Sequence, residues 1–245
     1  SVGLPVGLPP ISHISPILLM GSCFVENMGT FLTEAKFQLD LNPFGILYNP
    51  LSISSALKEI ITKKEYTEKD LFAYRGLWHS TMHHGSFSAI TPEATLQNIN
   101  ARLLQAHQTV PKLDWLMLTF GTAYVYEAKE TGKVASNCHK LPENDFNRRL
   151  LSVDEIVDEY TSLITDMAAC NAENSCCHAE ILLSQYMIED YKHSQQPFSS
   201  QHHSSEGKLY KSNVKQYPSG WLQSIWQDVR RPSLDNSFPS NSNTF

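Results

Sequence analysis

Two adjacent residues, Ser22 and Cys23, carry the side chains best placed to act as a nucleophile. They follow Gly21, where a short apolar run over 16–20 gives way to apolar residues at helical spacing. In open α/β sheets, ligands bind outside the carboxyl ends of the strands. A helix that begins there presents free N–H groups and a positive dipole end, which lower a thiol pKa and stabilise an oxyanion. The junction therefore predicts a site where a side chain attacks a carbonyl carbon.

A structural interpretation of the same junction needs no chemistry. In it, Ser22 caps the helix and Cys23 is a small buried hydrophobic residue. Spacing alone favours this interpretation, because strand–Gly–Ser–helix junctions are common. The sequence is also not the G-x-S-x-G elbow, since Phe24 stands where the second glycine would be.

Histidines form a second group with chemical potential. His83 follows His79 by four residues, a spacing that suits two metal ligands on a helix, and His84 is adjacent. The segment over 75–90 reads as strand and turn instead, so we expect a structural or substrate-pocket role and neither a metal nor an organic cofactor. Cys138 and His139 offer a Cys/His pair, for which a loop hydrogen-bond cluster is the simpler expectation.

The elements that position these residues alternate between strands and helices. Strands are expected at 16–20, 37–41 and 115–120. Helices are expected from about 24 to 35, 53 to 61, 96 to 106 and after the Ser-x-x-Glu capping box at 152–155. This alternation indicates a mainly parallel sheet covered on both sides, a three-layer α/β/α sandwich. The runs that end at Gly21 and Gly121 should be parallel neighbours that open on the same edge of the sheet.

Composition excludes several function classes. The net charge is −6, and basic residues form only isolated pairs such as Lys63-Lys64, so we expect no nucleic-acid partner. No apolar run approaches the roughly 20 residues of a membrane helix, and no export signal is visible. Five cysteines without a CxxC pair are typical of a reduced, cytoplasmic protein. The oligomeric state is left open.

Several stretches along the chain form a recognisable series. They are LMGSCFVEN (19–27), NPFGILYNP (42–50), LWHS (77–80) with the following histidine pair, TFGTA (119–123) and NCHKLP (137–142). In this order they resemble the GSCFA family, with Val25 in place of the alanine of the family signature, and the resemblance covers roughly residues 10–170. The family is grouped with the SGNH (GDSL-like) hydrolases, whose fold the resemblance implies.

This resemblance implies a role for each residue of the site. SGNH enzymes carry Gly-Asp-Ser after the first strand, so Cys23 takes the place of the nucleophile by register and Ser22 is the candidate by chemical type. Gly45 matches the oxyanion-hole glycine of the second block. Gly121 and Thr122 lie where Gly-x-Asn-Asp is found, without the asparagine donor. The implied reaction is hydrolysis or transfer of an acyl ester of a small-molecule or acylated substrate through a covalent intermediate.

The last third of the chain departs from the family. Members continue with a strand, expected here at 179–184, and finish with an Asp-x-x-His base. The segment around His202 and His203 only faintly echoes that block, with Ser199 and Ser200 where the aspartate belongs. We expect one domain over 10–190 and a low-order Ser/Gln/His/Asn-rich tail over 191–245 without a base.

Two other function classes stay open. One is a non-catalytic α/β binding module, or an inactive truncated or frameshifted family member. The other is a metal-dependent hydrolase built from His79, His83 and His84.

Overall fold

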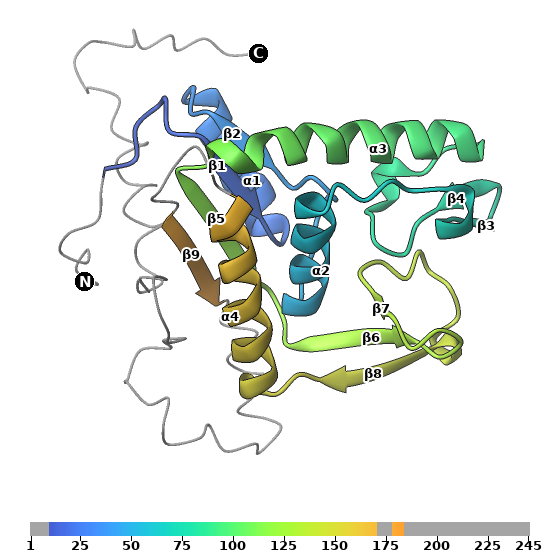
Figure 1. Ribbon diagram of the computed structural model, residues 1–245. Helices are drawn as coiled ribbons and strands as arrows, with labels where there is room; N and C mark the ends of the chain where they lie inside the picture. Colours follow the sequence, from blue (N-terminus) through green and yellow to red (C-terminus); the bar gives the residue numbers. More distant parts are fainter. Residues whose placement is uncertain (1–9, 171–177, 184–245) are drawn as a thin grey trace, which may run out of the picture.

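A four-stranded parallel sheet lies at the centre of the computed structural model, which describes residues 10–170 and 178–183 (Figure 1). The strand order is β2-β1-β5-β9, and every pair in it is parallel. The predicted mixed α/β class with a parallel sheet is therefore confirmed, while the three-layer sandwich stays a prediction. The strands are β1 (Ile17–Met20), β2 (Leu39–Leu41), β5 (Trp115–Phe120) and β9 (His178–Leu183).

The pairing of β1 with β5 confirms the predicted neighbours. Ile17 lies opposite Trp115 and Met20 opposite Leu118, so both strands end at the same edge of the sheet. Gly21 and Gly121 consequently open on one side. The strand expected at 179–184 is also present as β9, displaced by one residue, and it pairs with β5.

The helices begin where the sequence supplies capping side chains. The side chains of Ser22, Asn49 and Thr91 each accept a hydrogen bond from a first-turn N–H, and two of these helices then start with proline. Ser152 and Glu155 form the predicted reciprocal capping box at 3.1 and 3.4 Å. The described α-helices are α1 (Cys23–Glu34), α2 (Pro50–Ile61), α3 (Pro92–Thr109) and α4 (Val153–Cys170).

Successive residues of the buried strands feed two hydrophobic clusters. Leu18 and Met20 of β1 belong to a large cluster with residues of α2, α3 and α4, whereas Ile17 and Leu19 pack with residues of α1. This alternation follows from the two-residue period of a strand. Helices α2 and α4 lie side by side in Figure 1 and are in contact. The core thus fixes the ends of β1 and β5, which carry the candidate site.

Short antiparallel strands complete the described part of the chain. The hairpin of β3 (Phe72–Tyr74) and β4 (Leu77–His79) agrees with the strand and turn expected there. The sequence did not predict β6 (Tyr124–Ala128), which pairs with both β7 (Val134–Ala135) and β8 (Phe146–Leu150). Figure 1 shows this small sheet extending from the end of β5 toward the side that carries β3 and β4.

Within the described ranges, no helix is long and apolar enough to cross a membrane. The predicted tail over 191–245, with its histidine pair at 202–203, lies outside the described residues.

Candidate functional site

The turn between β1 and α1 is held closely against β5. The N–H of Gly21 donates to the side-chain oxygen of Asn42 at 2.9 Å, and its carbonyl accepts from the N–H of Leu47 at 2.9 Å. A Cβ on Gly21 would lie 2.1 Å from Oγ1 and 2.7 Å from the carbonyl oxygen of Thr119. Only glycine therefore lets the chain leave β1 so close to the end of β5.

Ser22 and Cys23 occupy different environments in this turn. Ser22 is half-buried and caps α1, with its Oγ accepting from the N–H of Phe24 at 3.4 Å. Cys23 is an exposed free thiol at the first position of the helix. The structural interpretation thus holds for Ser22, but its expectation of a buried Cys23 is wrong. Among the described residues, the N–H of Cys23 has no hydrogen-bond acceptor.

The side chain beside Cys23 is Tyr48, which the sequence analysis did not single out. Partial burial raises the pKa of the Tyr48 hydroxyl, and the proximity of Cys23 raises that pKa further. The carbonyl oxygen of Tyr48 accepts from the N–H groups of Gly121 at 2.7 Å and Thr122 at 3.1 Å. Tyr48 thereby joins the end of β5 to the start of α1.

Gly45 lies in the loop after β2 with φ at +78°, and a Cβ there would lie 2.3 Å from Cβ of His84. Its N–H donates to the carbonyl oxygen of Asn42 at 2.8 Å. The three residues predicted to line the oxyanion hole or the pocket, Gly45, Gly121 and Thr122, therefore lie in segments linked to the Gly21 turn. Their N–H groups bond to carbonyls of the protein, so an oxyanion role would require these bonds to open.

The histidines of the 79–84 segment are engaged with the protein rather than grouped around a metal site. His79 bonds through both ring nitrogens, to the carbonyl of Tyr74 at 3.1 Å and the hydroxyl of Ser88 at 2.7 Å. His84 caps a short 3-10 turn. His83 is buried and stacked on Phe44, and this burial lowers its pKa to about 3.

The loop that carries Cys138 and His139 forms the expected hydrogen-bond cluster. The N–H of His139 donates to the side chain of Asn137 at 2.9 Å, and its Nε2 lies 2.7 Å from the carbonyl of Ser80. Cys138 is half-buried, and burial raises its pKa. Within the described residues, no three His, Cys, Asp or Glu side chains are grouped so that they could hold a metal ion.

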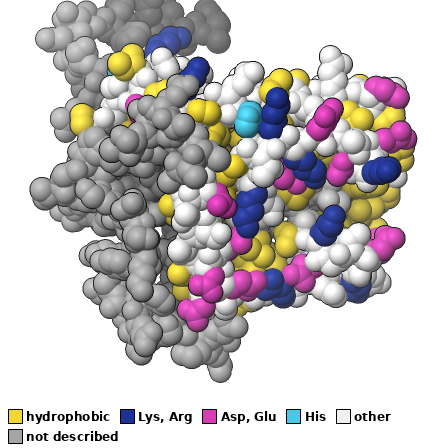
Figure 2. All heavy atoms as spheres, in the orientation of Figure 1, with side chains coloured by type: hydrophobic (Ala, Val, Ile, Leu, Met, Phe, Trp, Pro, Cys, Tyr) yellow, Lys and Arg dark blue, Asp and Glu magenta, His cyan; other side chains and the backbone are white. Residues whose placement is uncertain are grey.

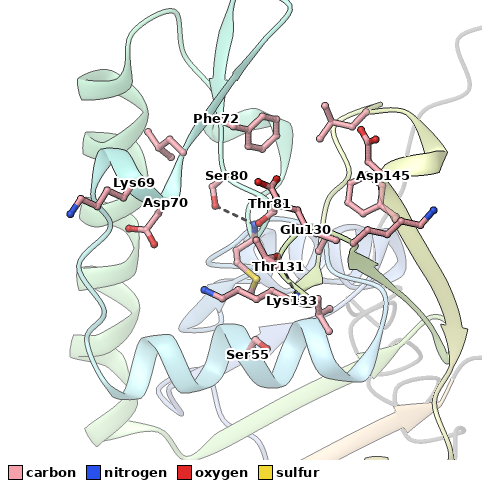
Figure 3. Close-up of a pocket in the computed structure, with 18 of the residues that line it drawn as sticks. Ser55, Lys69, Asp70, Phe72, Ser80, Thr81, Glu130, Thr131, Lys133 and Asp145 are labelled. Atoms are coloured by element: carbon pink, nitrogen blue, oxygen red, sulfur yellow. Dashed lines mark hydrogen bonds between the residues drawn. The ribbon is translucent and has the colours of Figure 1, made fainter.

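A hollow of about 930 Å³ lies apart from the Gly21 turn, between α2, the β3–β4 region and the small antiparallel sheet (Figure 3). Residues that line it include Ser55, Asp70, Ser80, Thr81 and Lys133, whereas none of the five predicted site residues does. Figure 2 shows positive and negative side chains interspersed on the face in view, without a single basic patch there. This hollow and the candidate nucleophile are therefore different features of the molecule.

The parallel sheet and the thiol at its carboxyl edge define an α/β protein with a potential nucleophile at the first strand–helix junction. The profile of the GSCFA family matches residues 16–179, and the chain belongs to this family. That match runs from the start of β1 into β9. Searches among curated proteins and solved structures gave no significant match.

Proposed function

We propose that the protein hydrolyses or transfers acyl esters through a covalent intermediate on Cys23. The observation that carries this proposal is the exposed Cys23 thiol, which begins α1 at the carboxyl edge of the parallel sheet. A helix N-terminus favours negative charge, so it suits both a thiolate and an oxyanion. Membership of the GSCFA family supports the reaction class by its grouping with SGNH hydrolases.

Cys23 is a better candidate than Ser22 on geometry. The Oγ of Ser22 is half-buried and turned to the N–H of Phe24, where it supports the helix. The thiol one residue later is exposed and is not needed for a cap. The N–H of Cys23, for which the described part of the chain provides no hydrogen-bond acceptor, is the first candidate donor to an oxyanion.

The chemical step needs neither a metal nor an organic cofactor. The thiolate adds to the ester carbonyl, the bond to the leaving oxygen breaks, and water or another alcohol then takes the acyl group from sulfur. The proposal also includes a small-molecule or acylated substrate, a three-layer domain over residues 10–190 and a cytoplasmic location. Whether water or another alcohol is the acceptor decides between hydrolase and transferase.

The experiment compares wild type with Cys23→Ala and Ser22→Ala on short-chain aryl esters, with and without EDTA. Cys23→Ala should abolish turnover and the mass increment of an acyl group on the 10–170 region. Ser22→Ala should keep turnover while losing a helix cap, which costs about 0.5–2 kcal/mol of stability. Activity that survives in Cys23→Ala contradicts the proposal, and inhibition by EDTA would favour the metal-dependent alternative.

A binding module without catalysis is the second candidate. One observation favours it: the N–H groups of Gly45, Gly121 and Thr122 all bond to carbonyls of the protein. A protein that binds an acylated ligand unchanged, with no acyl transfer to Cys23, would fit this alternative.

A further inference from the structure

We infer that the Cys23 site takes esters of uncharged, apolar acyl groups, and that the acyl chain packs on the exposed aromatic ring of Tyr48. This substrate class rests on the proposed function and narrows it for the same site. Two observations carry it: the place of the Tyr48 ring beside the strand–helix turn, and the near absence of charge in the segments that meet there.

The ring of Tyr48 is fixed at the end of β5. The carbonyl oxygen of Tyr48 accepts from the N–H groups of Gly121 at 2.7 Å and Thr122 at 3.1 Å. A Cβ added to Gly121 would lie 3.2 Å from Cδ1 of Tyr48 and 3.5 Å from Cβ of Ser22, so the ring and Ser22 border the same gap. Cys23 is the next residue of the chain. The ring is therefore held beside the start of α1 by its edge and its backbone.

This ring offers a substrate an apolar surface next to the thiol. Tyr48 is 46% exposed, and Cys23 is exposed as well. Covering the ring with an apolar chain is favourable, because it removes apolar surface from water. In the proposed reaction the acyl group stays bonded to sulfur until the second step, whereas the alcohol leaves in the first. A surface fixed beside the sulfur therefore serves the acyl group in both steps.

The segments that meet at the turn carry almost no charge. Over 20–30, 42–50 and 119–125, the one Asp, Glu, Lys or Arg is Glu26. Its carboxylate already accepts from the amide nitrogen of Asn42 at 2.7 Å. These three described segments thus contain no lysine or arginine that could pair with an anionic acyl group, and a charge that loses water without a partner is unfavourable. An uncharged acyl chain fits this surface.

Acyl-chain dependence tests the role of the ring in the full chain, with 4-nitrophenol as the constant leaving group. Wild type should have a higher kcat/KM for the hexanoate than for the acetate. In Tyr48→Ala, the hexanoate-to-acetate ratio should fall about 10-fold, since each buried methylene contributes roughly fourfold. Tyr48→Phe keeps the ring and should keep the ratio. Tyr74→Ala, which removes a ring of β3 whose hydroxyl bonds to the carbonyl of Lys140, is the remote control and should also keep it.

A charged ester of the same length tests the second part of the inference. The 4-nitrophenyl hydrogen adipate differs from the hexanoate by a terminal carboxylate, and wild type should turn it over at least about 10-fold less efficiently. Equal turnover of the two esters would overturn the preference for an uncharged acyl group. Hexyl and ethyl acetate vary the alcohol instead, and their ratio should be the same in wild type and Tyr48→Ala.

Three results would remove Tyr48 as the acyl surface: an unchanged hexanoate-to-acetate ratio in Tyr48→Ala, an equal loss on both esters, or a change confined to the hexyl and ethyl acetates. In each case the proposed function stands if Cys23→Ala is inactive. Full activity of Cys23→Ala, or a wild type that turns over none of these esters, would contradict the proposed function itself.

Discussion

The side-chain oxygen of Asn42 accepts a hydrogen bond from the backbone N–H of Gly21 at 2.9 Å, across 21 residues of sequence. The amide nitrogen of the same side chain donates to Glu26 at 2.7 Å. Asn42 thus ties the loop after β2 to both sides of the nucleophile turn. Its backbone has φ at +41°, a left-handed conformation that asparagine tolerates better than most residues.

We predict that Asn42→Asp lowers the free energy of unfolding at pH 7 by about 1–2 kcal/mol. The substitution keeps the shape and the oxygen that accepts from Gly21. However, it replaces the donor to Glu26 by a second carboxylate, and two adjacent carboxylates repel each other. The loss should shrink in acid as one carboxyl group becomes protonated, which urea denaturation at several pH values measures.

Glu26→Gln provides the control for that pair. In the double variant Glu26→Gln/Asn42→Asp, the glutamine amide can donate to the new carboxylate, so much of the stability at pH 7 should return. A double variant less stable than Asn42→Asp alone would mean that the two side chains do not interact as the structure has them. Such a cycle isolates the pairwise contribution.

Gly45→Ala should destabilise the protein more than Gly76→Ala. Both glycines have φ at +78°, so both substitutions carry the cost of a left-handed alanine, about 1–2 kcal/mol. A Cβ on Gly76 meets nothing within 4 Å, but on Gly45 it would lie 2.3 Å from Cβ of His84. The excess for Gly45→Ala should be about 1–3 kcal/mol by chemical denaturation. Equal losses of unfolding free energy in the two variants would show that the loop containing His84 moves away from an added Cβ without cost.

The parallel sheet could be predicted because its strands leave strong local signals. The runs over 16–20 and 115–120 are continuous and apolar, and the helices begin at capping residues or prolines that are visible in sequence. The small sheet of β6–β8 left no such signal. The sequence of strand β8 is Phe-Asn-Arg-Arg-Leu, and its exposed residues, Asn147 and Arg148, are of polar types that are common in loops.

The site could be predicted only in part for a related reason. The strand and helix patterns predicted that Ser22 and Cys23 lie at a strand–helix junction, which is the junction of β1 and α1, and the local cap explains why Ser22 supports the helix. The hydrogen bonds of Asn42 with Gly21 and of Tyr48 with Gly121 join residues more than 20 apart, and no periodicity in the sequence predicts them. Both residues lie in the matching stretch over 42–50, which was the one available signal.

Buried His83 should make the protein less stable in acid. Burial, with smaller contributions from the charges of Lys64 and His139, lowers its pKa from 6.5 to about 3. Between these values the unfolded chain binds a proton that the folded chain does not. The stabilising contribution is therefore complete above pH 6.5 and is lost as pH falls toward 3.

The measurement is the slope of unfolding free energy against pH in wild type and His83→Phe. Wild type should lose up to about 1.4 kcal/mol more per pH unit near pH 4–5 than the variant. The variant also lacks the hydrogen bond of His83 to Ser80, but that loss displaces the curve without changing its slope. Parallel curves would mean that His83 is protonated in the folded protein.

The titration of Tyr48 gives a direct test of its contact with Cys23 that needs no substrate. Three causes raise its pKa: burial first, then the charge of Cys23 and the hydrogen bond to it. Cys23→Ala removes the second and third, so the Tyr48 pKa should fall toward 10 yet stay above it because burial remains. NMR of the ¹³Cζ resonance in tyrosine-labelled protein, assigned with Tyr48→Phe, follows this group alone. Cys138→Ala, the other described free thiol, should leave the Tyr48 titration unchanged. If Cys23→Ala does so as well, the phenol and the thiol are not in contact in solution.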